Sequence, residues 1–110
     1  MKQYTNELQT AKLIELGFER PKGSHRYWRG NELVININYS IGELIEMLPK
    51  SLKNPYNPPL VIECNERWRV YYGVQEDYSW EWSIWYEEER NELIDALYNM
   101  IIVLNKEGVI

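Results

Sequence analysis

The stretch Glu87–Lys106 reads EEERNELIDALYNMIIVLNK, and its apolar residues recur with the period of an α-helix. One face of such a helix would carry Leu93, Ile94, Leu97, Met100, Ile101 and Leu104. The acidic residues 87–89 would occupy the first turn, where carboxylates complement the positive end of the helix dipole. Lys106 and the following Gly108 are typical of a helix end. We therefore predict a long amphipathic helix over Glu87–Lys106 that packs on the core.

The residues just before this helix alternate in the manner of a β-strand. Every second residue over Tyr78–Tyr86 is aromatic or aliphatic, namely Tyr78, Trp80, Trp82, Ile84 and Tyr86. A two-residue period places these side chains on one face of the strand, which should lie against the helix. Four more strands are expected, at His25–Arg29, Leu33–Tyr39, Leu60–Cys64 and Trp68–Tyr72.

The first two of these strands are predicted to form a hairpin that turns at Gly30 and Asn31, with Arg29 opposite Glu32. Alternation in the second strand predicts a core-facing side that consists of Leu33, Ile35, Ile37 and Tyr39.

Loop lengths and side-chain parity predict the pairing of the last three strands. A three-residue loop at 65–67 pairs Cys64 with Trp68, Ile62 with Val70 and Leu60 with Tyr72, all facing inward. A five-residue loop at 73–77 then pairs Val70 with Trp80 and Arg69 with Glu81. Arg69 would therefore lie on the outer face between Glu63 and Glu81. The inward parity of Cys64 predicts a buried, slowly reacting thiol.

Two shorter helices complete the fold. Thr5 or Asn6 can cap a first helix that runs to about Leu16, with Gly17 as its left-handed end. Ser40 and Glu43 form a capping box for a second helix, which Pro49 stops. We predict a single α+β domain over residues 1–110, in which an antiparallel sheet of about five strands packs against the long C-terminal helix.

The charge distribution argues against two classes of partner. The net charge is −5, with six basic and four acidic residues in 1–40 but six basic and thirteen acidic residues in 41–110. Nucleic acids and anionic membranes both select basic surfaces, so neither is expected to bind. No apolar segment follows Met1, and the run Met100–Leu104 is too short to span a bilayer. We expect a cytoplasmic protein.

Chemical motifs are sparse. His25 is the only histidine and Cys64 the only cysteine, so we expect no metal site and no internal disulfide. No glycine-rich phosphate loop occurs, and no cofactor is expected. The carboxylates of Glu76, Asp77 and Glu81 are candidates for acid–base chemistry, but nothing marks one of them as buried. We assign no catalytic residue.

Four apolar side chains are predicted to point away from the core. Tyr71 and Trp85 would form an exposed aromatic patch on the outer face of the sheet, which is either edge packing or a contact site. Tyr98 and Ile102 lie opposite the apolar face of the long helix. Either the tail Val109–Ile110 covers this pair, or a partner does. An isologous homodimer through the helix would bury both copies.

Three stretches carry a resemblance: Ala11–Phe18 (AKLIELGF), Ser40–Lys50 (SIGELIEMLPK) and Glu92–Ile110 (ELIDALYNMIIVLNKEGVI). With this layout the chain is similar to small uncharacterised proteins encoded by phages and prophages of gut bacteria. The resemblance implies a capped short helix ending in Leu-Pro, a strand meander containing tryptophan and a closing helix. It brings no activity, cofactor or catalytic residue.

The function expected from these observations is a non-enzymatic accessory or interaction protein of mobile-element origin, acting on a protein partner or on itself. Two alternatives from other functional classes remain open. One is a small-ligand-binding domain that uses the aromatic residues of the sheet, and the other is a small enzyme with a carboxylate site.

Overall fold

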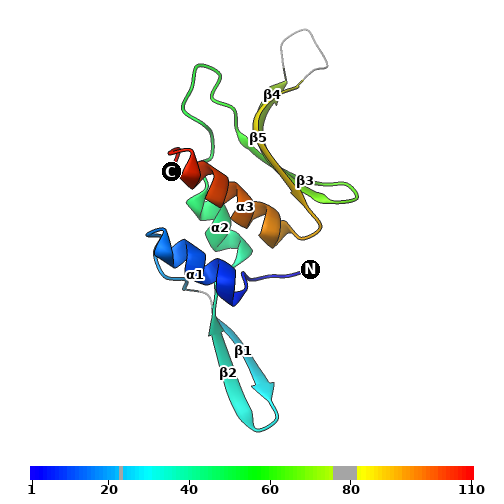
Figure 1. Cartoon of the computed structure of the whole chain (residues 1–110). Helices are drawn as coiled ribbons and strands as arrows, with labels where there is room; N and C mark the ends of the chain where they lie inside the picture. The colour runs from blue at the N-terminus through cyan, green and yellow to red at the C-terminus, as the bar shows by residue number, and fades with distance from the viewer. Residues whose placement is uncertain (23, 76–81) are drawn as a thin grey trace.

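The computed structural model describes residues 1–22, 24–75 and 82–110, which form an α+β structure (Figure 1). Its elements are α1 Glu7–Glu15, β1 Ser24–Arg29, β2 Glu32–Ile37, α2 Ile41–Met47, β3 Leu60–Cys64, β4 Trp68–Gln75, β5 Trp82–Arg90 and α3 Leu93–Lys106. The strands form two antiparallel sheets, one of β1 and β2 and the other in the order β3–β4–β5. The predicted α+β class is confirmed, whereas the single five-stranded sheet is wrong.

Helix α3 is the centre of the core. All six residues predicted for its apolar face are buried, and Ala96 is buried with them. The helix packs against β4 and β5 on one side and against α2 on the other (Figure 1). A helix enclosed by two layers buries a wider arc than a surface helix does. This explains why the small Ala96, outside the predicted stripe, is also inaccessible.

The helix begins at Leu93, so the predicted start at Glu87 is wrong. Glu87, Glu88 and Glu89 belong to the end of β5. Val70 pairs with Glu88 and Arg69 with Glu89, which contradicts the predicted partners Trp80 and Glu81. The predicted strand residues 78–81 lie outside the described part of the chain. The acidic run continues the strand because Arg69 lies across from it and binds Glu87.

The pairing of β3 with β4 is confirmed. Cys64 pairs with Trp68, Ile62 with Val70 and Leu60 with Tyr72, as the three-residue loop requires. Val70 and Tyr72 are fully buried, so the inner face of β4 meets the helix as predicted.

The predicted helix caps are confirmed as well. The Asn6 side chain accepts from Gln9 N at 2.8 Å, and the Gln9 side chain accepts from Asn6 N at 3.0 Å. Ser40 and Glu43 form the same reciprocal arrangement at the start of α2. Gly17 ends α1 with a φ of 97°. These local signals depend on neighbouring residues only, which is why the sequence predicts them well.

The hairpin β1–β2 leaves the body of the molecule instead of joining the larger sheet. It extends from one end of a structure that measures 62 × 31 × 16 Å (Figure 1). Leu33 and Ile37 are 48% and 57% exposed, so the prediction that they face the core is wrong, while Tyr39 is buried as predicted. The chain after Ile37 pairs with the N-terminal segment, since Thr5 N donates to Tyr39 O at 2.9 Å. That pairing holds the chain beside the helices and directs β2 outward.

Candidate functional site

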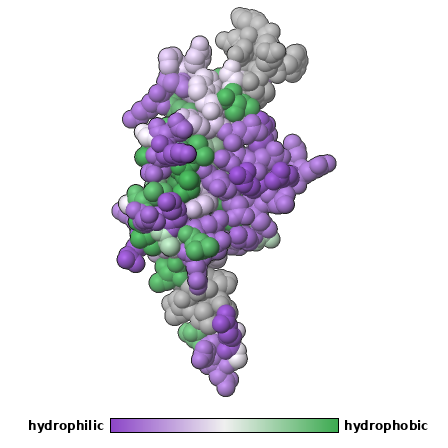
Figure 2. All heavy atoms as spheres, viewed as in Figure 1, coloured by the Kyte–Doolittle hydropathy of each residue, from purple (hydrophilic) through white to green (hydrophobic). Residues whose placement is uncertain are grey.

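The outer face of the three-stranded sheet carries a cluster of charges around Arg69. Its Nη1 atom lies 2.9 Å from Glu63 Oε1, and its Nε atom lies 2.6 Å from Glu87 Oε1. The guanidinium also lies 4.3 Å from the centre of the Tyr71 ring. Tyr71 is only 4% exposed, so its predicted place in an exposed aromatic patch is wrong. Figure 2 shows mainly hydrophilic residues on the sheet side of the molecule.

Each charge of this cluster lies next to one of opposite sign. The hydrogen bond to Glu87 is the main reason why the pKa of Arg69 is raised. Burial is the main reason why the pKa of Tyr71 is raised, and the charge of Glu63 adds to it. Both carboxylates are partly exposed and paired with Arg69. The cluster therefore holds three strands together and does not resemble an acid–base site. The candidates Glu76, Asp77 and Glu81 lie outside the described residues.

Trp85 lies at an irregularity of the sheet that the sequence does not reveal. Tyr72 pairs with Tyr86 and Gly73 pairs with Ile84, so Trp85 is the extra residue of a β-bulge. Neighbours in a regular strand point to opposite faces, but Trp85 and Tyr86 both line one pocket. Trp85 is 37% exposed, and its ring lies 5.8 Å from the ring of Tyr56.

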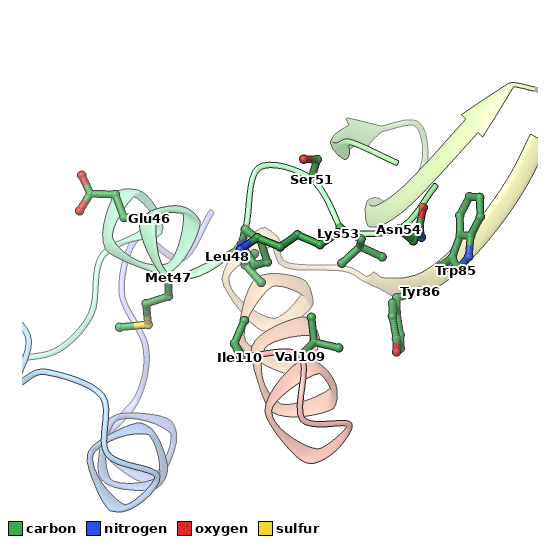
Figure 3. Close-up of a pocket in the computed structure, with 12 residues that line it drawn as sticks. Glu46, Met47, Leu48, Ser51, Lys53, Asn54, Trp85, Tyr86, Val109 and Ile110 are labelled. Atoms are coloured by element: carbon green, nitrogen blue, oxygen red, sulfur yellow. The ribbon is translucent and has the colours of Figure 1, made fainter. Parts of the chain in front are cut away.

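This pocket has a volume of about 610 Å³. We call it the bulge pocket; its lining comes from the end of α2, the following loop, β5 and the C-terminal tail: Glu46, Met47, Leu48, Pro49, Ser51, Leu52, Lys53, Asn54, Trp85, Tyr86, Val109 and Ile110. Figure 3 shows Trp85 and Tyr86 at one side and Met47 and Glu46 at the other. Its size lies within the roughly 300–1,000 Å³ of ordinary ligand sites.

Tyr98 and Ile102 are half-buried and pack against the core within one chain. The tail turns back after Gly108, which has a φ of 74°, and Val109 N donates to Leu104 O at 2.8 Å. Ile110 packs against the core as well. The tail therefore turns back on the helix, as one of the two alternatives requires. The four predicted surface residues do not form one patch, because Tyr71 is buried and only Trp85 is substantially exposed.

The hairpin carries the apolar surface that sequence reasoning missed. Trp28 of β1 is 70% exposed and pairs directly with Leu33 of β2. Ile37 lies four residues after Leu33 in β2. Opposed residues share a face of the sheet, and so do residues four apart in a strand. Figure 2 shows hydrophobic surface next to hydrophilic surface on this hairpin. The alternation of Leu33 and Ile37 in β2 predicts an apolar face, and this face is exposed on the hairpin instead of packing on the core.

Cys64 is exposed, so the predicted buried thiol is wrong. Its pairing with Trp68 is as predicted, but β3 is an edge strand, and α3 packs against the other two strands, β4 and β5. The end of β3 therefore receives little cover from the helix. The sulfur lies 3.5 Å from Asn65 O.

Among the described residues, no group of three or more His, Cys, Asp or Glu side chains is arranged to hold a metal ion. In the same part of the chain, no helix combines the length and the apolar character needed to cross a membrane. No family model matches the chain, and no curated protein or solved structure is significantly similar to it. Any functional inference therefore starts from the hairpin and the bulge pocket.

Proposed function

We propose that this chain is a non-enzymatic interaction protein and that the projecting hairpin β1–β2 binds its protein partner. The observation that carries the proposal is the opposed pair of exposed apolar residues, Trp28 and Leu33. Tryptophan is among the residues that contribute most to protein interfaces, since its ring buries a large area when a partner covers it.

The energetics of the hairpin support this role. A two-stranded hairpin with no other layer is marginally stable in water. Of the strand residues whose side chains the structure describes, namely 28, 29, 32, 33 and 37, none belongs to the buried cluster of the body. In the part of the chain that the structure describes, β1 and β2 pair only with each other, so the outer edge of each strand has no neighbouring strand. A partner that covers Trp28, Leu33 and Ile37, or pairs with an edge, would stabilise the hairpin.

A photocrosslinking experiment tests the proposal. A benzoylphenylalanine in place of Trp28 should yield covalent adducts with one protein in the native cell. The matched control carries the same group in place of Leu8, which is 83% exposed on α1. Adding Leu33→Ser and Ile37→Ser to the first variant should abolish its adducts. If position 28 yields none, or position 8 yields the same ones, the hairpin is not the binding element.

The homodimer through Tyr98 and Ile102 stays a separate prediction. Both side chains are half-buried within one chain, so they offer less free area than the hairpin. Sedimentation of the wild type beside a Tyr98→Glu, Ile102→Lys variant would test it. The mobile-element origin and the cytoplasmic location also remain predictions.

A further inference from the structure

We propose that the bulge pocket binds a small carboxylate with an apolar, ring-containing body. The β-bulge at Trp85 is the structural reason for the site. It brings two adjacent aromatic side chains, Trp85 and Tyr86, to the lining of one pocket. A bulge commonly redirects a side chain toward a binding site. The close approach of the strands at Gly73 maintains this geometry, since an added Cβ there would lie 3.0 Å from Ser83 O.

The apolar part of the lining suits a ring. Leu48 and Leu52 are 4% and 6% exposed, and Val109 and Ile110 of the reversed tail line the same pocket. The aromatic residues lie at one side and Val109 and Ile110 near the middle of the view in Figure 3. A flat apolar ligand would bury its ring against these residues, and the aromatic faces would favour stacking.

The polar groups of the lining are mainly hydrogen-bond donors. In the described part of the chain, the Lys53 ammonium, the Trp85 indole N–H and the Tyr86 hydroxyl form no hydrogen bond or ion pair with protein groups. Asn54 Oδ1 already accepts from Tyr56 N and Asn57 N at 2.8 and 3.0 Å, which leaves its amide N–H groups as donors.

The one carboxylate side chain of the lining, Glu46, points away from the Trp85 side in Figure 3. An ammonium and several unpaired donors beside apolar walls select a ligand that brings acceptors and a negative charge. A carboxylate supplies both.

The test uses the whole protein and two probes that share one ring system, naphthoate and naphthylmethylammonium. Amide shifts in proton–nitrogen correlation spectra should saturate with naphthoate and should be confined to the bulge pocket. The ammonium probe should bind more weakly. Lys53→Gln should weaken naphthoate binding about fivefold, as expected for one partly exposed ion pair. Lys50→Gln is the matched control, because this exposed lysine lies outside the lining, and it should change nothing.

Lys53 is exposed, so its substitution should leave the fold intact, and the melting temperature verifies this. The proposal is overturned if naphthoate gives no saturable shifts at millimolar concentration or shifts residues elsewhere. It is also overturned if the ammonium probe binds equally well, or if Lys53→Gln binds naphthoate as the wild type does.

Discussion

The hydroxyl of Thr10 donates a hydrogen bond of 2.5 Å to Asn38 Oδ1, and both residues are buried. Since the Thr10 proton goes to Asn38, the 2.7 Å contact between the two threonine hydroxyls has Thr5 as the donor. Thr5 in turn accepts from Tyr39 N at 3.0 Å. This chain of bonds fastens the end of the hairpin to α1 and the N-terminal segment. It therefore helps to decide that β2 leaves the body at Asn38.

Replacing Thr10 with valine tests this network. Thr10→Val keeps the shape but leaves the Thr5 hydroxyl without an acceptor and Asn38 Oδ1 without a donor. We expect it to lower the free energy of unfolding by about 1–3 kcal/mol, the cost of unpaired buried polar groups. Thr10→Ser retains the hydroxyl and should lower the free energy of unfolding by a smaller amount. Denaturant unfolding measures both, and equal values for the two variants would contradict the network.

Gly73 is predicted to be intolerant of any side chain. A Cβ there would lie 3.0 Å from Ser83 O and 3.3 Å from Ile84 Cγ1, so Gly73→Ala requires the neighbouring strand to shift by a few tenths of an ångström at the bulge. The expected destabilisation is about 1–3 kcal/mol. Gly42 in α2 is the matched control, since its nearest atom would be Ser40 Oγ at 3.9 Å. Gly42→Ala should be neutral or stabilising by up to about 1 kcal/mol. Similar melting temperatures for the two variants would argue against close strand contact.

The buried hydroxyl of Tyr72 should make the free energy of unfolding decrease at alkaline pH. Burial raises the pKa of Tyr72, whose hydroxyl donates to Pro49 O at 2.6 Å. The folded state therefore keeps this proton when the unfolded chain, with a tyrosine pKa of about 10, releases it. The stabilisation is complete below that pH, and the free energy of unfolding should fall as the pH rises above it. Tyr72→Phe should make the fall shallower, and unfolding curves between neutral and alkaline pH measure it. An unchanged slope would contradict the assignment.

Cys64 should react readily with thiol reagents in the native protein, because it is exposed at the end of β3, an edge strand of the sheet. Labelling with a maleimide should proceed at a rate close to that of the denatured protein. Cys64→Ser is the control for reaction at other groups. A native rate that is orders of magnitude lower would show that the thiol is buried, as the strand parity alone suggests.

The sequence by itself determined the elements that depend on near neighbours. Caps at Asn6 and Ser40, the stop at Gly17 and the buried face of α3 all follow from residues within one or two helical turns. The pairing of β3 with β4 was predictable too, because a short loop and side-chain parity together favour the observed register.

Tertiary structure decided the features that depend on distant residues. The alternation of Leu33 and Ile37 is equally suited to a buried sheet and to a projecting hairpin, and the contact between Thr10 and Asn38 selects the second. The acidic run 87–89 suits a helix start as well as a strand, and Arg69 draws it into β5. The bulge at Trp85 changes which side chains of β5 share a face of the sheet. Its position depends on the pairing of Gly73 with Ile84, and the sequence alone does not reveal that pairing. Patterns in the sequence specify which faces are apolar, but only long-range contacts determine what covers them.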